Sequence, residues 1–222
     1  MHTGEISWKS RELLKLSPKI FKLLDLFPRT ANVPGHKIEK RKTMKENMIV
    51  IKKVDRDNFF ETSMDLFDRY QEVQNVFRME SGKLVLKKQP FTETWSPERK
   101  REKAAEILSG KYLTFCAFDG ESVIGEIMLI PELNDNRLII DSLHVSREYR
   151  QHGIGRQLVE TACYYAKSRG AEALYASCCS AEETIRFYTA MGFEPSEHPI
   201  TSCVEDEPFD IQMECRFMDD NR

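Results

Sequence analysis

A short basic loop with two glycines is the stretch of this chain whose residue types and spacing most clearly indicate chemistry. It runs from Arg150 to Arg156 with the sequence Arg-Gln-His-Gly-Ile-Gly-Arg. The apolar, β-branched run 137–145 before it predicts a buried strand, and apolar residues at helical spacing after it predict a helix ending at Gly170. Free amides at the first turn of a helix, glycines and basic side chains together favour phosphate. A tight turn that binds nothing is the alternative.

Two spaced motifs carry a resemblance to a known family. The first is Arg150-x-x-Gly153-x-Gly155, and the second is Phe187-Tyr188-x-x-x-Gly192-Phe193. Together they resemble the GNAT superfamily of acyl-CoA-dependent N-acyltransferases, whose signature is Gln/Arg-x-x-Gly-x-Gly/Ala. A dinucleotide-binding fingerprint is excluded, because Leu158 stands where its third glycine would be.

The resemblance extends from about Met48 to Phe217 and implies a set of donor contacts. It implies acetyl-CoA as co-substrate and no metal. The pantetheine arm would pair with strand backbone at Leu143, His144 and Val145. The pyrophosphate would rest on the loop, with the basic side chain of Arg150 and the amides of Gln151, His152, Gly153, Ile154, Gly155 and Arg156.

Acetyl transfer to an amine needs a base, an oxyanion donor and an acid for the leaving thiolate. Tyr188 matches the family tyrosine that protonates the thiolate; periodicity alone would make Phe187 and Tyr188 aromatic core. The asparagine usual six residues before Phe187 is Ala181, so one contact to the donor is missing. Ser180 is a candidate replacement.

Two carboxylates compete for the role of base. Strand alternation puts Asp141, Leu143 and Val145 on one face, and Asp141 is similar in position to the base glutamate of diamine acetyltransferases in this superfamily. A carboxylate in an apolar strand could have a raised pKa. Glu126 is the competing base, and a water relay from either is a further alternative. Alternation points His144 the opposite way from Asp141, which favours a structural role.

Charge and cysteine usage narrow the class of protein. The 222 residues carry a net charge of −3, divided between a basic segment 1–47, at +6, and an acidic remainder, at −9. An acidic catalytic domain fits a cationic acceptor and argues against nucleic acid. The six cysteines do not have the spacing of metal ligands, which predicts reduced thiols in the core. No apolar run approaches the length of a membrane span, and the two observations together predict a cytoplasmic protein. The cluster Glu205, Asp206, Glu207 and Asp210 is either a solvated loop or an attraction for the amine.

Residues 1–47 are predicted to be a separate basic extension, poorly ordered or amphipathic, before a GNAT-like domain at 48–222. Translation from Met44 or Met48 is an alternative. A membrane- or partner-tethering role for this segment is a rival interpretation of the protein.

The predicted domain is α/β, of α+β type, with a mixed, mostly antiparallel sheet and helices on both faces. A first strand at 48–54 leads into a helix capped by Asp55 or Asp57, and 70–95 is ambiguous, although the family places acceptor-binding helices there. Later elements are a helix from Pro97 to Gly110 and a hairpin around Asp119-Gly120. The last ones are a strand at 173–178, a helix capped by Ser180, and a hairpin around 204–208.

These features predict an acetyl-CoA-dependent N-acetyltransferase acting by direct attack on the primary amine of a small cationic molecule. A protein lysine or N-terminus is the alternative acceptor. A non-catalytic acyl-CoA-binding module on the same fold is a rival from another class. A homodimer is one assembly that such a chain could form.

Overall fold

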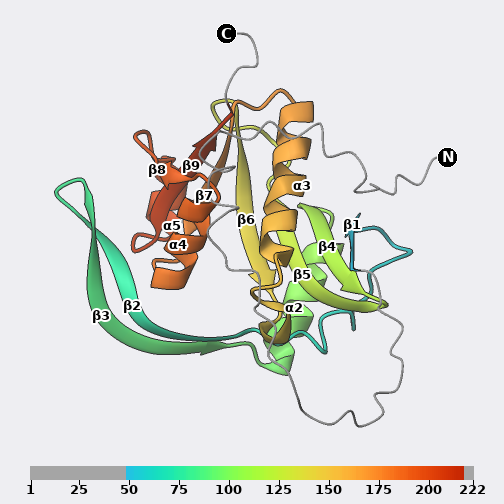
Figure 1. Ribbon diagram of the computed structural model, residues 1–222. Coiled ribbons are helices and arrows are strands. Elements are labelled where there is room, and N and C mark those ends of the chain that lie inside the picture. The colour runs from blue at the N-terminus through green and yellow to red at the C-terminus, as the bar shows by residue number, and fades with distance from the viewer. Residues whose placement is uncertain (1–48, 218–222) are drawn as a thin grey trace, which may run out of the picture.

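The computed structural model describes residues 49–217 (Figure 1). The predicted extension 1–47 and both alternative start methionines lie outside the described residues. No helix within the described range is long and apolar enough to cross a membrane.

Seven strands form the central sheet in the order β1-β4-β5-β6-β7-β9-β8 (Figure 1). They are β1 (Val50–Lys53), β4 (Leu113–Asp119), β5 (Ser122–Leu129), β6 (Arg137–Val145), β7 (Ala173–Cys178), β8 (Glu194–Pro195) and β9 (Ile211–Arg216). Neighbours β6 and β7 run parallel, joined by a helical crossover, and the other neighbouring pairs are antiparallel. The predicted mixed, mostly antiparallel sheet is therefore confirmed.

Helices cover both faces of this sheet. They are α2 (Pro97–Leu108), α3 (Ile154–Ser168), α4 (Glu182–Ala190), α5 (Thr201–Asp206) and the single turn η1 (Arg147–Tyr149). The residues of α3 predicted at helical spacing, such as Leu158 and Ala162, are fully buried in a core that α4 also joins. On the opposite face, Ala104 and Ile107 of α2 pack with Phe67. The helix predicted from Pro97 is α2, and Ser96 caps it, because the Ser96 Oγ accepts a hydrogen bond from the amide of Arg99.

The helix predicted after β1 does not form. The segment consists of turns, because the Asp55 carboxylate accepts hydrogen bonds from the amides of Asp57 and Asn58 and so closes a local turn instead of capping a helix. Phe59 is still buried under α2, whereas Phe60 is exposed. The apolar residues of this segment are therefore buried individually and do not follow a helical periodicity.

A long hairpin occupies the segment where the family resemblance implied helices. Strands β2 (Tyr70–Glu80) and β3 (Lys83–Thr94) pair with each other as a separate two-stranded sheet. Both residues of the connecting turn, Ser81 and Gly82, have positive φ, the conformation that suits a two-residue hairpin turn. The implied acceptor-binding helices at 70–95 are therefore wrong for this chain.

The hairpin joins two separate parts of the domain, as Figure 1 shows along the lower edge of the molecule. At its base, the carbonyl of Asp68 accepts a hydrogen bond from the amide of Arg147, just after β6. Further along β2, the amide of Phe77 donates to the carbonyl of Ser180, and Val76 pairs with Ala181 before α4. Strand β2 therefore bridges the end of β6 and the start of α4.

Two details near the C-terminus differ from prediction. Ser180 does not cap α4, whose N-cap is Ala181; instead the Ser180 Oγ accepts a hydrogen bond from Nη1 of Arg78 on the hairpin. Of the predicted last hairpin, β8 contributes only two residues, and α5 lies between β8 and β9. All six cysteines are free thiols, four of them buried.

Candidate active site

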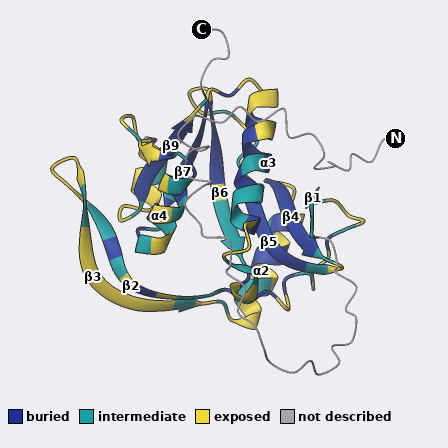
Figure 2. Cartoon of the chain, viewed as in Figure 1, coloured by how far each residue is buried: buried dark blue, intermediate teal, exposed yellow. Residues whose placement is uncertain are grey.

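Strands β6 and β7 diverge halfway along their length. Their pairing covers only 137–140 with 173–176, so β6 has no strand partner on that edge from Asp141 onward. Figure 2 shows the same change, because β6 is buried where it pairs with β7 and half-buried beyond. We call this divergence the splay.

A β-bulge at Asp141 accompanies the splay. On the β5 side, Leu129 pairs with Ile140 and Met128 pairs with Ser142, which leaves Asp141 as the extra residue. Beyond the bulge, Leu143 and Val145 pack against the core on the α3 face. The bulge therefore breaks the alternation that was expected to place Asp141 on the same face as these two residues.

The backbone groups of Leu143 and Val145 point into the splay. The amide of Ser146 bonds the carbonyl of Ile124, which makes Val145–Gly125 a non-hydrogen-bonded pair of the antiparallel ladder. Leu143 lies in the same alternating phase, so its amide and carbonyl also face away from β5. The backbone of His144, in the opposite phase, faces β5 instead. Of the three residues expected to pair with the pantetheine, only Leu143 and Val145 turn their backbone groups toward the splay, and the carbonyl of Val145 already accepts a hydrogen bond from Arg150.

The glycine loop has the geometry expected of an anion site, but its two glycines serve different purposes. Gly153 is the N-cap of α3 with a left-handed φ of 79°, and a Cβ there would meet nothing within 4 Å. Gly155 makes room for α4, since a Cβ there would lie 3.3 Å from Cε2 of Phe187. Gly153 is therefore required by backbone conformation, and Gly155 by close packing.

The other loop residues differ in their burial and in their hydrogen bonds. The Nε of Arg150 donates to the carbonyl of Val145 at 3.0 Å, and burial, followed by repulsion from Arg69, lowers the pKa of the Arg150 guanidinium. His152 and Gln151 are exposed, whereas Ile154 is buried in the core. Among the loop side chains, Ile154 is thus part of the core, whereas those of Gln151 and His152 are open to solvent.

A buried polar cluster lies on the α2 face of the sheet, next to the splay. The carboxylate of Glu126 on β5 is fully buried, and its Oε1 lies 2.6 Å from Nδ1 of His144 on β6. The Ser142 hydroxyl lies 3.3 Å from both carboxylate oxygens and accepts a 2.8 Å hydrogen bond from Nζ of Lys103 on α2. Lys103 is itself buried. The cluster pairs one buried carboxylate with one buried ammonium and one imidazole.

The balance of forces on Glu126 favours its ionised form. Burial is the largest single influence and raises its pKa, but the positive charge of Lys103 and the hydrogen bonds from His144 and Ser142 together lower the pKa below its usual value. A carboxylate can only accept hydrogen bonds, so Nδ1 of His144 carries the proton in this pair. The Nε2 atom is then left with its lone pair in the neutral imidazole.

Aromatic rings cover the imidazole. Trp95 packs edge-on against His144 with ring centroids 4.8 Å apart, and Phe67 stacks on Trp95 at 5.8 Å. His144 keeps one fifth of its surface exposed. The imidazole is therefore oriented by Glu126 and Trp95 while remaining accessible.

Asp141 lies outside this cluster. It is largely solvent-exposed, although the surrounding protein removes part of the hydration of its carboxylate and raises its pKa; Lys103 and a hydrogen bond from Tyr112 act in the opposite sense. The structure thus brings Glu126 and His144 together and leaves Asp141 exposed at the bulge of β6, near Lys103.

Tyr188 sits on α4 with its ring in the core. The ring is edge-on to Phe187 and Phe193, with centroids 5.3 and 5.0 Å away. Burial, then the nearby Cys178 and Glu126, raises the pKa of Tyr188 well above its usual value. The phenol therefore stays protonated at any physiological pH and retains a proton to donate.

The acidic residues near the C-terminus lie around the end of α5. Burial, followed by a hydrogen bond with Glu207, raises the pKa of Asp210 to about 8. The neighbouring Phe209 packs under Arg78 of the hairpin, 5.7 Å from ring centroid to Cζ. The acidic group therefore lies beside the hairpin arm.

Several residues of the site were missed by sequence reasoning. The side-chain role of His144 depends on the β5–β6 register, and the sequence does not contain that register. Lys103 offered a signal, because it occupies a core position one helical turn before Ile107 on the apolar side of α2. Trp95 falls in the segment 70–95, whose structure was ambiguous from the sequence, and Arg69 directly precedes that segment.

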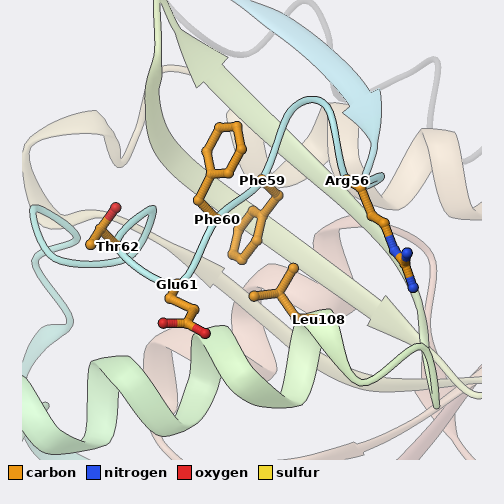
Figure 3. Close-up of a pocket in the computed structure, with 6 residues that line it drawn as sticks. All are labelled: Arg56, Phe59, Phe60, Glu61, Thr62 and Leu108. Atoms are coloured by element: carbon orange, nitrogen blue, oxygen red, sulfur yellow. The ribbon is translucent and has the colours of Figure 1, made fainter.

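An open hollow on the surface lies elsewhere (Figure 3). It is next to the C-terminal end of α2 and is lined by Arg56, Phe59, Phe60, Glu61, Thr62 and Leu108. It shares no residue with the polar cluster or the glycine loop, so we assign it no part in the candidate site.

Comparisons with known proteins identify the family and the fold. The model of the Acetyltransferase (GNAT) family matches residues 84–193, which include the polar cluster, the loop and α4. Nourseothricin acetyltransferase superimposes with a TM-score of 0.58 at 19% identity, covering 76% of this chain and 98% of that one. The provisionally named streptothricin acetyltransferase from Bacillus anthracis str. Ames, in complex with acetyl coenzyme A, gives 0.58 at 16% identity, with coverages of 77% and 99%.

A GNAT-family acetyltransferase from Staphylococcus aureus MU50 gives a TM-score of 0.52 at 14% identity, covering 77% of this chain and all of that one. No curated protein sequence gave a significant match. The fold is that of GNAT enzymes, and the chain belongs to the GNAT family of acetyltransferases.

Proposed function

We propose that this protein transfers the acetyl group of acetyl-CoA to the primary amine of a small molecule by direct attack. The observation that carries the proposal is the pairing of Glu126 with His144 beside the free edge of β6. A base and a donor-binding edge are thereby supplied by the same strand.

The donor would lie along the splay. The backbone groups of Leu143 and the amide of Val145 would offer the pantetheine the partners that an added strand would have, while the Val145 carbonyl is held by Arg150. The pyrophosphate would take the amides of the loop from Gln151 to Arg156 at the N-terminus of α3, where the helix dipole favours an anion. The left-handed conformation of Gly153 supports this assignment, because it turns the chain from the loop into α3.

The amine would lose its proton to His144. Glu126 accepts a hydrogen bond from Nδ1–H, so Nε2 is the basic atom: it can take a proton from the bound ammonium before attack, or from the amine nitrogen as it attacks the thioester carbonyl. Lys103 keeps the carboxylate ionised through its charge, and Trp95 holds the ring in place. Asp141 is the second candidate base, supported by its raised pKa and opposed by its exposure.

The thiolate would be protonated by Tyr188 as it leaves. The residue belongs to the second family motif, and its hydroxyl holds its proton under all working conditions because its pKa is raised. Its ring lies in the core that α4 shares with α3, the helix that follows the loop.

The acceptor is proposed to be a small cationic amine, with the acidic residues from Glu205 to Asp210 as an attraction for positive charge. A protein lysine or N-terminus is the alternative acceptor. Nourseothricin acetyltransferase, one of the similar folds, is named for a small-molecule acceptor, and this supports the first choice.

The test is thiol release from acetyl-CoA, measured with and without a panel of amines and checked by mass spectrometry of the acetylated product. The proposal predicts thiol release that depends on the amine. Donor binding without turnover on any small amine, peptide or protein would instead support a non-catalytic acyl-CoA-binding module.

A further inference from the structure

A buried arginine at the base of the hairpin has more hydrogen-bond donors than partners. Arg69, just before β2, is 8% exposed, and its Nη2 donates to Oε2 of Glu93 at 2.8 Å. Its Nε and Nη1 atoms are buried and have no hydrogen-bond partner among the described residues. Buried charged donors without partners are costly, so such a group is expected to have an acceptor in the working protein.

Positive charge gathers around this arginine. Arg147 lies over the ring of Tyr70, next to Arg69 in sequence, and repulsion from Arg69 and Arg147 contributes to the lowered pKa of Arg150. The nearby acids are Glu93, which is 41% exposed, Asp68, and Asp210, whose pKa is raised to about 8 so that its carboxyl is mostly protonated at neutral pH. These acids only partly offset the charge of the three guanidinium groups, and the position therefore favours an additional anion.

Arg69 is linked to the proposed base through Trp95. Its carbonyl accepts a hydrogen bond from the amide of Trp95, and the ring of Trp95 packs on His144. The preceding residue, Asp68, is bonded through its amide and carbonyl to Ser146 and Arg147 at the end of β6. Arg69 also acts on the pKa of Cys179, which follows β7. The Arg69 charge therefore lies near the ends of both strands that form the splay, β6 and β7.

We propose that Arg69 binds a carboxylate of the acceptor, so that the acceptor is an amino acid or another small molecule with both an amine and a carboxylate. The proposal rests on the proposed function and specifies its substrate class. Guanidinium groups suit carboxylates because they offer several donors in one plane. Arg69 precedes the family-matched segment 84–193, which fits a role in recognising this chain's own acceptor.

The experiment compares matched acceptors with and without the negative charge. Initial rates of thiol release are measured for amino acids of increasing side-chain length and for their carboxamides, with the wild type, Arg69→Gln, Arg69→Lys and Lys88→Gln. Wild-type kcat/KM should favour the acids by roughly 10- to 100-fold, the value of a charge-assisted hydrogen bond. Arg69→Gln should bring the ratio of acid to amide close to one.

Two further variants serve as controls for this comparison. Arg69→Lys keeps the charge but not the planar donor group, and should give an intermediate ratio. Lys88→Gln removes an exposed charge from β3 of the same hairpin, and should keep the wild-type ratio. An equal ratio in the wild type and in Arg69→Gln overturns the proposal and assigns the buried donors to water.

A phosphate of the donor is the other source of an anion, and a second arm separates it. Acetylpantetheine lacks the phosphates of acetyl-CoA. If Arg69 held a donor phosphate, Arg69→Gln would raise the KM for acetyl-CoA but not for acetylpantetheine, and the ratio of acid to amide would not change. That pattern contradicts the carboxylate assignment.

Binding provides a readout that does not depend on turnover. N-acetylamino acids should raise the Tm of the wild type more than their carboxamides do, and Arg69→Gln should lose this difference. If no amine is acetylated but the difference in Tm persists, the proposed function fails and the carboxylate site stands. If amines are acetylated without any preference for acids, the carboxylate site fails and the function stands.

Discussion

The Nδ1 atom of His144 lies 2.6 Å from Oε1 of Glu126, and both side chains project from neighbouring strands onto the α2 face of the sheet. The short contact orients an accessible imidazole with a fully buried carboxylate, while Lys103 balances the charge beneath them. This relationship makes the end of β6 a place for proton transfer.

Replacing Glu126 with glutamine should reduce both turnover and stability. Glu126→Gln removes the charge that fixes the His144 tautomer, so kcat should fall by about 10²-fold. Lys103 would keep its 3.4 Å ion pair with Glu106 but lose the attraction of the buried Glu126 charge, so unfolding free energy should fall by about 1–3 kcal/mol, the cost of a weakened buried polar network. Steady-state kinetics and urea unfolding measure the two effects. Unchanged turnover in a folded Glu126→Gln variant would show that the carboxylate has only a structural role.

Tyr188→Phe should separate acid catalysis from packing. The variant keeps the ring that contacts Phe187 and Phe193, but removes the only proton that the side chain can donate. We expect kcat to fall by roughly 10²-fold with little change in the Kd of acetyl-CoA. A thioester whose thiol is a better leaving group should restore much of the rate. If Tyr188→Phe turned over at the wild-type rate, Tyr188 would have a packing role in the core and no role as an acid.

The two loop glycines should respond differently to alanine. Gly155→Ala brings a Cβ within 3.3 Å of Phe187, so unfolding free energy should fall by about 1–3 kcal/mol through overpacking. Gly153→Ala meets no neighbour but must adopt a left-handed backbone, which costs about 1–2 kcal/mol. Urea unfolding measures both losses, and the rise of Tm with acetyl-CoA measures donor binding in each. Equal stability of Gly155→Ala and the wild type contradicts the packing role of this glycine.

Asp210 should make the protein less stable as pH rises. Its folded pKa of about 8 lies above the unfolded value, so the folded state holds an extra proton between about pH 4 and 8. Unfolding free energy should therefore decrease with rising pH in this window, by at most about 1.4 kcal/mol per pH unit from this group. Asp210→Asn should flatten the dependence, with Glu205→Gln as the control for losing one carboxylate. Urea unfolding between pH 5 and 8 checks this, and an unaltered slope in Asp210→Asn speaks against the shift.

Much of the fold follows from local sequence patterns. The strand at 137–145 and the strand at 173–178 were predicted with the bounds that the structure gives, because their apolar, β-branched runs are delimited by turns. The prediction of a helix after β1 was wrong, because the Asp55 side chain closes a turn where a helix cap was expected. The hairpin at 70–94 has a mostly polar outer strand, which hides the alternation of a half-buried strand.

The site was predictable only where it depends on local motifs. The glycine loop has a fixed spacing, and the free edge of β6 follows from the family resemblance. The bulge at Asp141 shifts the register by one residue, which exchanges faces and cannot be inferred from one strand alone. The same register brings His144 to Glu126, and so the base proposed from the structure differs from the one first favoured by alternation.

The most direct test of the account is the turnover of His144→Gln compared with Asp141→Asn across pH, using acetyl-CoA and the best amine from the panel. His144→Gln should lower kcat by about 10²-fold and remove the acidic limb of the pH–rate profile, because the imidazole is the group that must be unprotonated. Asp141→Asn should keep that limb. Wild-type turnover and an intact limb in His144→Gln, together with loss of both in Asp141→Asn, would contradict the Glu126–His144 pair as the base of this acetyltransferase.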